Sequence, residues 1–437
     1  MEPSASAKQT STGVGANPAS LEAEIRALAA SAKAAATVLA AASTKVKRAV
    51  LNRAAELLEG ELAEGIVDAN ARDLARAKEN DLAPALVDRL ALDLARLRKV
   101  ADGVRQVAAL PDPVGSVDGL RTLENGLQIG RMRIPLGVIG IIYESRPNVT
   151  ADAAALCVMS GNAVILRGGS EAFESNKAIA AAFARALAEA GLPPGCVTPI
   201  PTTDRAATGV LIQQHDLVDL IIPRGGEGLI RYVTEHSRVP VIQHFKGVCH
   251  VYVDGEADLD KALAIAVNAK AHRPGVCNAM ETLLVDAAVA EPFLKALAPA
   301  MAEAGVTLRA DEPARALLPN AEAATDADWD EEYLALVLAV KVVDGFEGAL
   351  AHVRAHGSSH TESIVTESYT KAQRWLREVD ASLVLVNAST RFNDGFELGL
   401  GAEMGISTTK MHAYGPMGLE ELCARKWIAY GDGQIRQ

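Results

Sequence analysis

Apolar runs that alternate with helical patterns are the feature that most restricts the fold of this chain. Residues 135–143 form an apolar run that ends in a polar stretch at 144–148, and a helical pattern covers 151–160. The same order of apolar run, polar turn and helix begins again at residue 163 and at residue 217. Strands and helices in this order build a parallel sheet with helices on both faces, which binds ligands at the carboxyl ends of its strands. We therefore expect an α/β fold.

A second unit of the same kind is expected over residues 251–394. Its helical patterns lie at 258–271, 291–303, 345–354 and 370–379, with apolar runs between them. Residues 21–110 also carry apolar side chains at helical spacing and predict several helices that pack against the rest of the protein. The fold class predicted is α/β, with two doubly wound domains.

A β-hairpin is predicted between the helical region and the first sheet. Asn125-Gly126 separates two stretches of roughly alternating residues, at 120–123 and 127–134, and Asn-Gly favours a tight turn. A two-stranded ribbon is marginal alone, so we expect it to pack against another subunit or against the C-terminal tail. Residues 120–135 and 395–437 would then form an oligomerisation element, with a short helix at 419–423.

The remaining domain boundaries follow from these patterns. Residues 1–19 are rich in Ser, Ala, Thr and Gly and predict a disordered tail. Residues 20–119 and 136–250 are expected to form a dinucleotide-binding domain, and residues 251–394 a domain that supplies a catalytic cysteine.

Charge and cysteine usage exclude several classes of protein. A net charge of -12 argues against a protein that binds nucleic acid through its phosphates, and no apolar run approaches the ~20 residues that span a bilayer. The five cysteines are an odd number without C-x-x-C spacing, which favours a reducing compartment, and we expect the cytoplasm. His352, His356 and His360 fit a polar loop better than a metal site, so no metal is expected.

Cys277 is the candidate nucleophile. It follows Pro274-Gly275, which frees the backbone from helix, and it precedes an apolar run. His272 and Arg273 lie close in sequence and could favour the thiolate. Cys157 and Cys249 lie in apolar runs, Cys196 in a turn and Cys423 in the short predicted helix, as expected of structural cysteines.

Two predicted strands end in Gly-Gly beside an arginine. Glycine lets backbone N–H groups approach a phosphate, and arginine can pair with it. The candidate cofactor-binding residues are Arg167, Gly168, Gly169 and Ser170 in the first turn, and Arg224, Gly225 and Gly226 in the second.

With these features the sequence resembles the aldehyde dehydrogenase superfamily, and within it the gamma-glutamyl phosphate reductase family, also called glutamate-5-semialdehyde dehydrogenases. The likeness extends from about residue 21 to residue 430. Its most specific stretches are residues 144–150, 247–252, 273–278, 356–364, 399–408 and 415–422.

The resemblance implies an NADPH-dependent reductase that converts L-glutamyl 5-phosphate to L-glutamate 5-semialdehyde and releases phosphate, the second step of proline biosynthesis. It implies that Cys277 is the nucleophile and that Asn148 helps to hold the thioester oxyanion. Arg167 would meet the adenosine ribose, where an arginine suits a 2′-phosphate. Glu332 matches the glutamate that steadies the nicotinamide ribose.

The sequence departs from aldehyde oxidisers of this superfamily at one informative place. Residues 243–247 read Gln-His-Phe-Lys-Gly where those enzymes carry a glutamate that activates water. Without that base the thioester is protected from hydrolysis, which suits an acyl-phosphate reductase. Candidates for orienting the substrate are Arg146, His360, and the stretch from Glu403 to Ser407.

Partners and alternatives complete the prediction. We expect a homo-oligomer, and transient contact with the glutamate 5-kinase that makes the unstable acyl phosphate. The alternatives are a cysteine-dependent acyltransferase or thioesterase without a nicotinamide, a scaffold protein without chemistry, and a reductase of another acyl phosphate or acyl-CoA.

Overall fold

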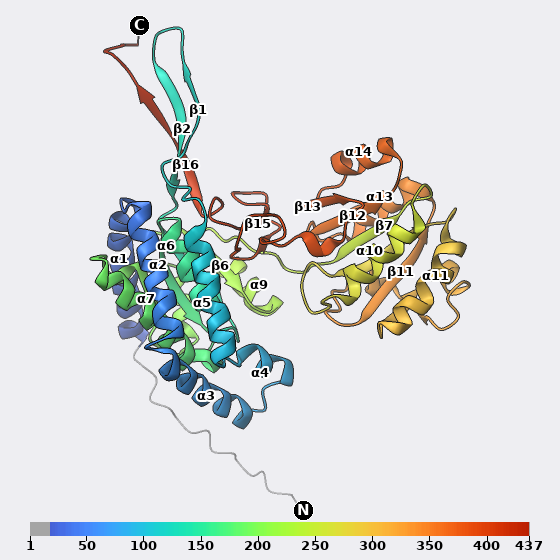
Figure 1. Ribbon diagram of the computed structural model, residues 1–437, viewed down its shortest axis with the longest axis horizontal. Coiled ribbons are helices and arrows are strands. Elements are labelled where there is room, and N and C mark those ends of the chain that lie inside the picture. The colour runs from blue at the N-terminus through green and yellow to red at the C-terminus, as the bar shows by residue number, and fades with distance from the viewer. Residues whose placement is uncertain (1–17, 437) are drawn as a thin grey trace, which may run out of the picture.

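The computed structural model describes residues 18–436 (Figure 1). Most of the predicted disordered tail, residues 1–17, lies outside this range. Pro18 and Ala19 belong to the first helix, α1 (Pro18–Ala40), so the predicted tail is two residues too long. Proline is well suited to the first turn of a helix, because it has no N–H to leave unbonded there.

In the described part of the chain five helices precede the first strand, where several were predicted. After α1 come α2 (Thr44–Glu59), α3 (Ala63–Glu79), α4 (Pro84–Leu90) and α5 (Leu94–Ala109). The apolar face of α2, which includes Leu51 and Leu58, is buried in one core with α5 and the first sheet. Ser43 caps α2 by accepting a hydrogen bond from the N–H of Val46.

The first sheet has four parallel strands in the order β5-β4-β3-β6. The strands are β3 (Val138–Tyr143), β4 (Ala163–Gly168), β5 (Val197–Pro199) and β6 (Leu220–Arg224), and the helices between and after them are α6 (Asn148–Met159), α7 (Phe173–Glu189), α8 (Ala206–Leu211) and α9 (Glu227–His236). From β3 the chain moves to β4 on one side and later to β6 on the other. The carboxyl ends of these three strands therefore border the crevice in which such sheets bind ligands.

The second sheet has seven parallel strands in the order β10-β9-β11-β8-β7-β12-β13. The strands are β7 (Cys249–Val253), β8 (Met280–Asp286), β9 (Thr307–Ala310), β10 (Glu322–Ala323), β11 (Val337–Val343), β12 (Thr361–Val365) and β13 (Leu383–Val386); the helices are α10 (Leu259–Ala271), α11 (Ala290–Glu303), α12 (Glu312–Arg315), α13 (Gly345–His356) and α14 (Tyr369–Glu378). The two sheets form two lobes, which confirms the predicted α/β class (Figure 1). β7 begins two residues before the predicted boundary at 251.

The predicted hairpin is β1 (Val117–Thr122) and β2 (Gln128–Pro135), and it projects from the first lobe (Figure 1). The C-terminal strand β16 (Cys423–Tyr430) pairs antiparallel with the other edge of β2 along its whole length. The ribbon thus packs against the chain's own tail, one of the two expected supports. The predicted short helix at 419–423 is wrong: residues 419–422 form a turn, because β2 offers an open edge with which the residues from Cys423 onward pair.

Residues 395–422 connect the second lobe to β16 and lie between the two lobes. They contain β14 (Ile406–Ser407) and β15 (Gly415–Pro416), which pair with each other. Met404 and Met417 are buried in the core of the first lobe, so this part of the tail packs on the lobe instead of extending the hairpin. Within residues 18–436, no helix combines the length and the apolar character that crossing a membrane would require.

A buried ion pair fixes α2 to the loop before the hairpin. The Lys47 side chain is fully buried, and its Nζ lies 2.7 Å from Oδ2 of Asp112 and donates to the carbonyl of Met159 at 3.2 Å. Lys47→Met leaves the Asp112 carboxylate buried and unpaired, so we expect it to lower the free energy of unfolding of the first lobe by about 3–5 kcal/mol. Urea unfolding followed by circular dichroism measures this change.

The matched control is Arg26→Met. Arg26 forms an exposed ion pair with Asp216, and exposed pairs contribute only about 0–1 kcal/mol. Equal destabilisation by the two substitutions would contradict the assignment of the larger effect to burial.

Candidate active site

Cys277 lies in the loop between α10 and β8, where the two lobes meet. It is half-buried, whereas the other four cysteines are buried. Cys423, expected in a helix, begins β16, and Cys249 begins β7. Cys277 is therefore the thiol that a substrate can reach.

The loop carrying Cys277 is held by close backbone packing. A Cβ added to Gly247 would lie 2.1 Å from the carbonyl oxygen of Cys277, so no side chain fits there. The Cys249 thiol donates to the same carbonyl at 3.2 Å, and the Asn278 amide donates to the carbonyl of Asn393 at 2.9 Å. These contacts fix the direction of the Cys277 side chain.

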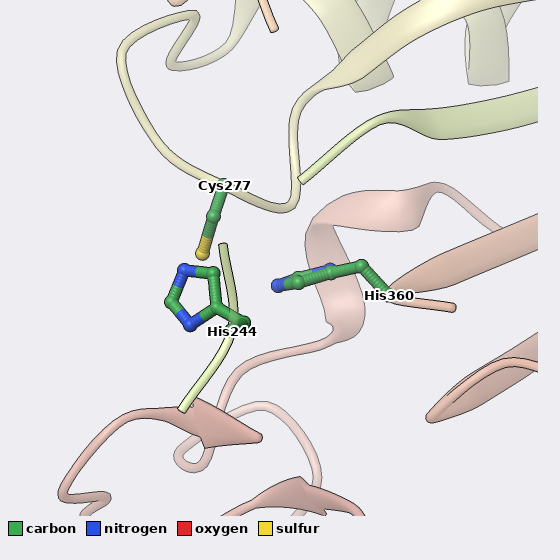
Figure 2. A group of neighbouring side chains, drawn as sticks. All are labelled: His244, Cys277 and His360. Atoms are coloured by element: carbon green, nitrogen blue, oxygen red, sulfur yellow. The ribbon is translucent and has the colours of Figure 1, made fainter. Parts of the chain in front are cut away.

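Two imidazoles converge on the Cys277 sulfur (Figure 2). A ring nitrogen of His244, a ring nitrogen of His360 and Sγ of Cys277 all lie within 4.8 Å of one another. Nδ1 of His244 is 2.8 Å from the carbonyl of Ile406; because a carbonyl only accepts, Nδ1 carries the hydrogen and Nε2 keeps a free lone pair. His360 bonds Thr361 through Nδ1 at 2.7 Å, and its buried Nε2 has no partner.

Burial keeps this cluster uncharged at neutral pH. It raises the pKa of the Cys277 thiol to about 11, against the opposing effect of the Arg224 charge. Burial lowers the pKa of His244 to about 4 and that of His360 to about 3. A neutral thiol thus lies beside neutral imidazoles, and Nε2 of His244 can accept its proton.

Within residues 18–436, the ligand atoms of these three side chains also lie close enough together to hold a metal ion. His352 and His356 are not among them: His352 lies 3.3 Å from Nζ of Lys341, and His356 pairs with Asp330 at 2.9 Å. The Arg224 charge acts on both His244 and Cys277. It disfavours a second cation at this position.

The predicted substrate residues lie around this cluster with one exception. Arg146 is half-buried, and burial lowers its pKa to about 10. Burial raises the pKa of Glu403 to about 7, and its carboxylate accepts the N–H of Gly395 at 3.0 Å. The exception is Ser407, which is buried and bonds Thr409 through its hydroxyl at 2.7 Å, so it shapes the loop.

Asn148 is exposed at the start of α6. Its amide donates to Oδ2 of Asp152 at 3.0 Å, and burial raises the pKa of Asp152 to about 6. Asp152 was missed from the sequence, although its spacing of four residues along a helix places it on the same face as Asn148. Its role in holding the amide is therefore a structural finding.

The first predicted cofactor turn lies at the end of β4. Arg167 is buried, and its guanidinium donates to the carbonyls of Gly168, Thr203 and Asp204. A cavity of about 110 Å³ opens beside this turn, lined in part by Tyr143, Gly168 and Lys177. Gly169 and Ser170 lead into a short 3₁₀ turn.

The second predicted cofactor turn is bonded to Glu144, a residue that was not predicted from the sequence. Glu144 accepts the N–H of Gly226 at 2.9 Å, and a Cβ on Gly225 would lie 2.4 Å from its carboxylate.

Glu332 is half-buried, and its carboxylate accepts the N–H of Gly247, the glycine packed against Cys277. Its charge contributes to the raised pKa of Cys277.

Comparison with known proteins decides the family. Residues 4–325 match the aldehyde dehydrogenase family. The chain belongs to this family.

Relatives confirm the closer resemblance as well. A gamma-glutamyl phosphate reductase from Moorella thermoacetica is 56% identical over 93% of this chain and 97% of its own length, and one from Geobacter metallireducens is 53% identical over 95% and 99%. The crystal structure of a gamma-glutamyl phosphate reductase from Thermotoga maritima, 43% identical, superposes with a TM-score of 0.93 over 95% of this chain and 100% of that chain.

The packing of Gly247 against Cys277 gives a specific prediction. Gly247→Ala places a methyl group where the Cys277 carbonyl lies, so the loop must move and the sulfur leaves its position. A displacement of about 1 Å at a reacting atom costs on the order of 100-fold in rate, and we expect kcat/KM to fall by at least that much. Steady-state kinetics at 340 nm measures it.

Gly275→Ala is the matched control in the same loop, because a Cβ there would meet its nearest atom at 3.8 Å. It should keep kcat/KM within a few fold of the parent. Similar losses in both variants would show that the loop tolerates no side chain at all, and would contradict the argument from close approach.

Proposed function

We propose that the enzyme reduces L-glutamyl 5-phosphate to L-glutamate 5-semialdehyde with NADPH and releases phosphate, the second step of proline biosynthesis. The observation that carries this proposal is the accessible Cys277 thiol beside neutral His244, at the junction of the two lobes. The full-length relatives named gamma-glutamyl phosphate reductase support the choice of substrate.

The first step forms a thioester on Cys277. Sγ attacks the acyl carbon, the bond from that carbon to the phosphate oxygen breaks, and the thiol proton passes through Nε2 of His244 to the departing phosphate. Because the ground-state thiol is protonated, a base within reach of its proton is required. Asn148, held by Asp152, is proposed to donate to the oxyanion together with backbone N–H groups.

The second step reduces the thioester. The nicotinamide supplies a hydride when bound. Addition of that hydride to the acyl carbon would break the carbon–sulfur bond and release the aldehyde, and the Cys277 thiolate would then take a proton from solvent. Glu332, held by the N–H of Gly247, is proposed to steady the nicotinamide ribose close to Cys277.

The segment around His244 protects the intermediate from water. Residues 243–247 supply no carboxylate, and burial leaves His244 a weak base with a pKa of about 4. A weak base activates water poorly, so the thioester can persist until hydride arrives.

NADPH is proposed over NADH on the basis of positive charge near the cavity at the end of β4. Lys177 lines that cavity, and Arg167 lies in the turn beside it. Either cation suits a 2′-phosphate. Arg167 would have to exchange a bond to a backbone carbonyl for one to the phosphate.

The reverse reaction tests the proposed function. With glutamate semialdehyde, phosphate and NADP⁺, the parent should produce absorbance at 340 nm, and Cys277→Ala should lower the rate by at least about a thousandfold, because the acyl acceptor is lost. An acyltransferase, thioesterase or scaffold would give no signal in either protein. A reductase of another acyl group would respond to a different aldehyde.

Cys423→Ala is the control, because Cys423 is buried where β16 begins. It should retain the parent's rate at a temperature where both are folded. Full activity in Cys277→Ala would refute the mechanism.

We also propose that the protein is a homo-oligomer assembled through the three-stranded sheet of β1, β2 and β16. This sheet exposes Trp427, Tyr430 and Leu120 at 61%, 57% and 55%. Trp427 and Tyr430 lie three residues apart on β16 and therefore point to opposite faces, so both faces of the sheet expose large apolar side chains of the kind that mark interaction surfaces. Contact with a glutamate 5-kinase and a cytoplasmic location stay predictions.

Light scattering tests the oligomer. The parent should have at least twice the chain mass of 45.8 kDa, and Trp427→Glu combined with Leu120→Glu should shift it toward the monomer, because charge opposes burial of this surface. A monomeric parent at micromolar concentration would contradict the proposal.

A further inference from the structure

Four arginines gather around Cys277 from separate parts of the chain. Arg224 ends β6, and after burial its charge is the largest influence on the pKa of Cys277, which it lowers. Arg146 follows β3, and Arg391 lies in the 3₁₀ turn Thr390–Phe392; both interact electrostatically with Cys277. Arg273 precedes Cys277 and interacts electrostatically with Arg146 and Arg391.

None of the four has a counterion inside the protein. Within residues 18–436, no carboxylate lies within 4.0 Å of their guanidinium nitrogens, and no guanidinium of the four donates a hydrogen bond to another protein group. Most arginines elsewhere are either paired, as Arg53 is with Glu189 at 2.7 Å, or exposed when they lack an ion pair, as Arg121 and Arg238 are. Arg146, Arg224 and Arg391, in contrast, are half-buried.

Unpaired charge in a half-buried site is unfavourable. Burial lowers the pKa of both Arg146 and Arg391, which means that their charged forms lose solvation without gaining a partner. Nearby acids compensate only in part: Asp394 and Glu397 oppose the lowered pKa of Arg391 without reversing it, and Glu403 has a pKa raised to about 7. A site of this kind favours an anionic ligand.

The fold holds Arg224 at the centre of this group. Gly405 has a φ of +137°, and a Cβ there would lie 2.1 Å from Nη1 of Arg224. The Nη1 end of the guanidinium therefore lies against the backbone of Gly405, in the segment between the lobes. It acts on Cys277, His244, Asp152 and Glu403, which places it among the reacting groups.

We propose that Arg224, with Arg146 beside it, binds the phosphoryl group of the substrate and stabilises the phosphate as it leaves. This assignment rests on the proposed function and differs from the sequence prediction, in which Arg224 contacts cofactor phosphate. The phosphorus of an acyl phosphate is two bonds from the carbon that Sγ attacks, so its oxygens must lie beside Cys277. A planar guanidinium with free donors matches them and offsets the charge that develops on the leaving oxygen.

The first test needs no turnover. Inorganic phosphate is the probe, and alkylation of Cys277 by iodoacetamide is followed by mass spectrometry at fixed pH, each variant being compared with its own rate in the absence of phosphate. Phosphate should slow alkylation of the parent saturably, and Arg224→Gln should raise the half-protecting concentration at least tenfold. Arg224→Lys keeps the positive charge but lacks the planar guanidinium with its forked donors, so its half-protecting concentration should lie between those of the parent and Arg224→Gln.

Arg167→Gln is the matched control, because Arg167 is bonded to carbonyls at the end of β4; it should keep the parent's protection by phosphate. Gly405→Ala keeps the Arg224 charge but displaces the guanidinium, so it should weaken protection as Arg224→Gln does. Arg224 has no protein partner to lose, and its variants should keep the parent's melting temperature.

The second test is the reverse reaction. Arg224→Gln should raise the KM for phosphate at least tenfold and leave the KM for NADP⁺ within about twofold. A raised KM for NADP⁺ with an unchanged KM for phosphate would overturn the proposal and restore the cofactor role. Unaltered protection by phosphate in Arg224→Gln would overturn it as well. If the parent showed no reductase activity while Arg224→Gln still weakened the protection of Cys277 by phosphate, the proposed function would be refuted and the phosphate-binding site would be supported.

Discussion

The close approach of Gly247 to the backbone of Cys277 is the contact on which the site depends. It joins the segment that leaves the first lobe to the loop that presents the nucleophile from the second. Glu332 accepts the N–H of the same glycine. A side chain at 247 would therefore displace both the backbone that carries the Cys277 sulfur and the N–H that Glu332 accepts.

The electrostatics of the site follow from this geometry. Burial alone would make Cys277 a poor nucleophile, because it raises the thiol pKa to about 11. Arg224 opposes burial, and the lone pair of His244 accepts the proton that must leave. Because His244 is itself buried and weakly basic, it accepts a proton only from a group a few ångströms away, which is the Cys277 thiol. The same arrangement that permits thioester formation thus disfavours activation of bulk water.

Much of the fold could be predicted from the sequence because its signals are local. The polar ends of β3, β4 and β6 and the Asn125-Gly126 turn each depend on a few adjacent residues. The turn at 419–422 was expected to be helical because its local pattern permits a helix, but the open edge of β2, nearly three hundred residues earlier, favours strand pairing from Cys423 onward.

The directions of side chains at the site could not be predicted in this way. Arg167 and Arg224 both precede Gly-Gly at a strand end, so the local sequence pattern predicts the same role for both. In the structure Arg167 bonds carbonyls of its own lobe, whereas Arg224 lies against Gly405 from the distant tail. Likewise His244 and His360 meet at Cys277 only because the two lobes join there.

The distribution of paired and unpaired charge separates scaffold from site. Lys47 with Asp112, and Lys270 with Glu281, are buried cations whose carboxylate partners lie in the same lobe. These pairs retain their neutralising partners whatever is bound. The arginines around Cys277 lack such partners, so their free energy depends on what occupies the crevice. An anionic substrate that enters between the lobes relieves this repulsion, and release of phosphate restores it. Repulsion among these arginines thereby contributes to the affinity for the acyl phosphate.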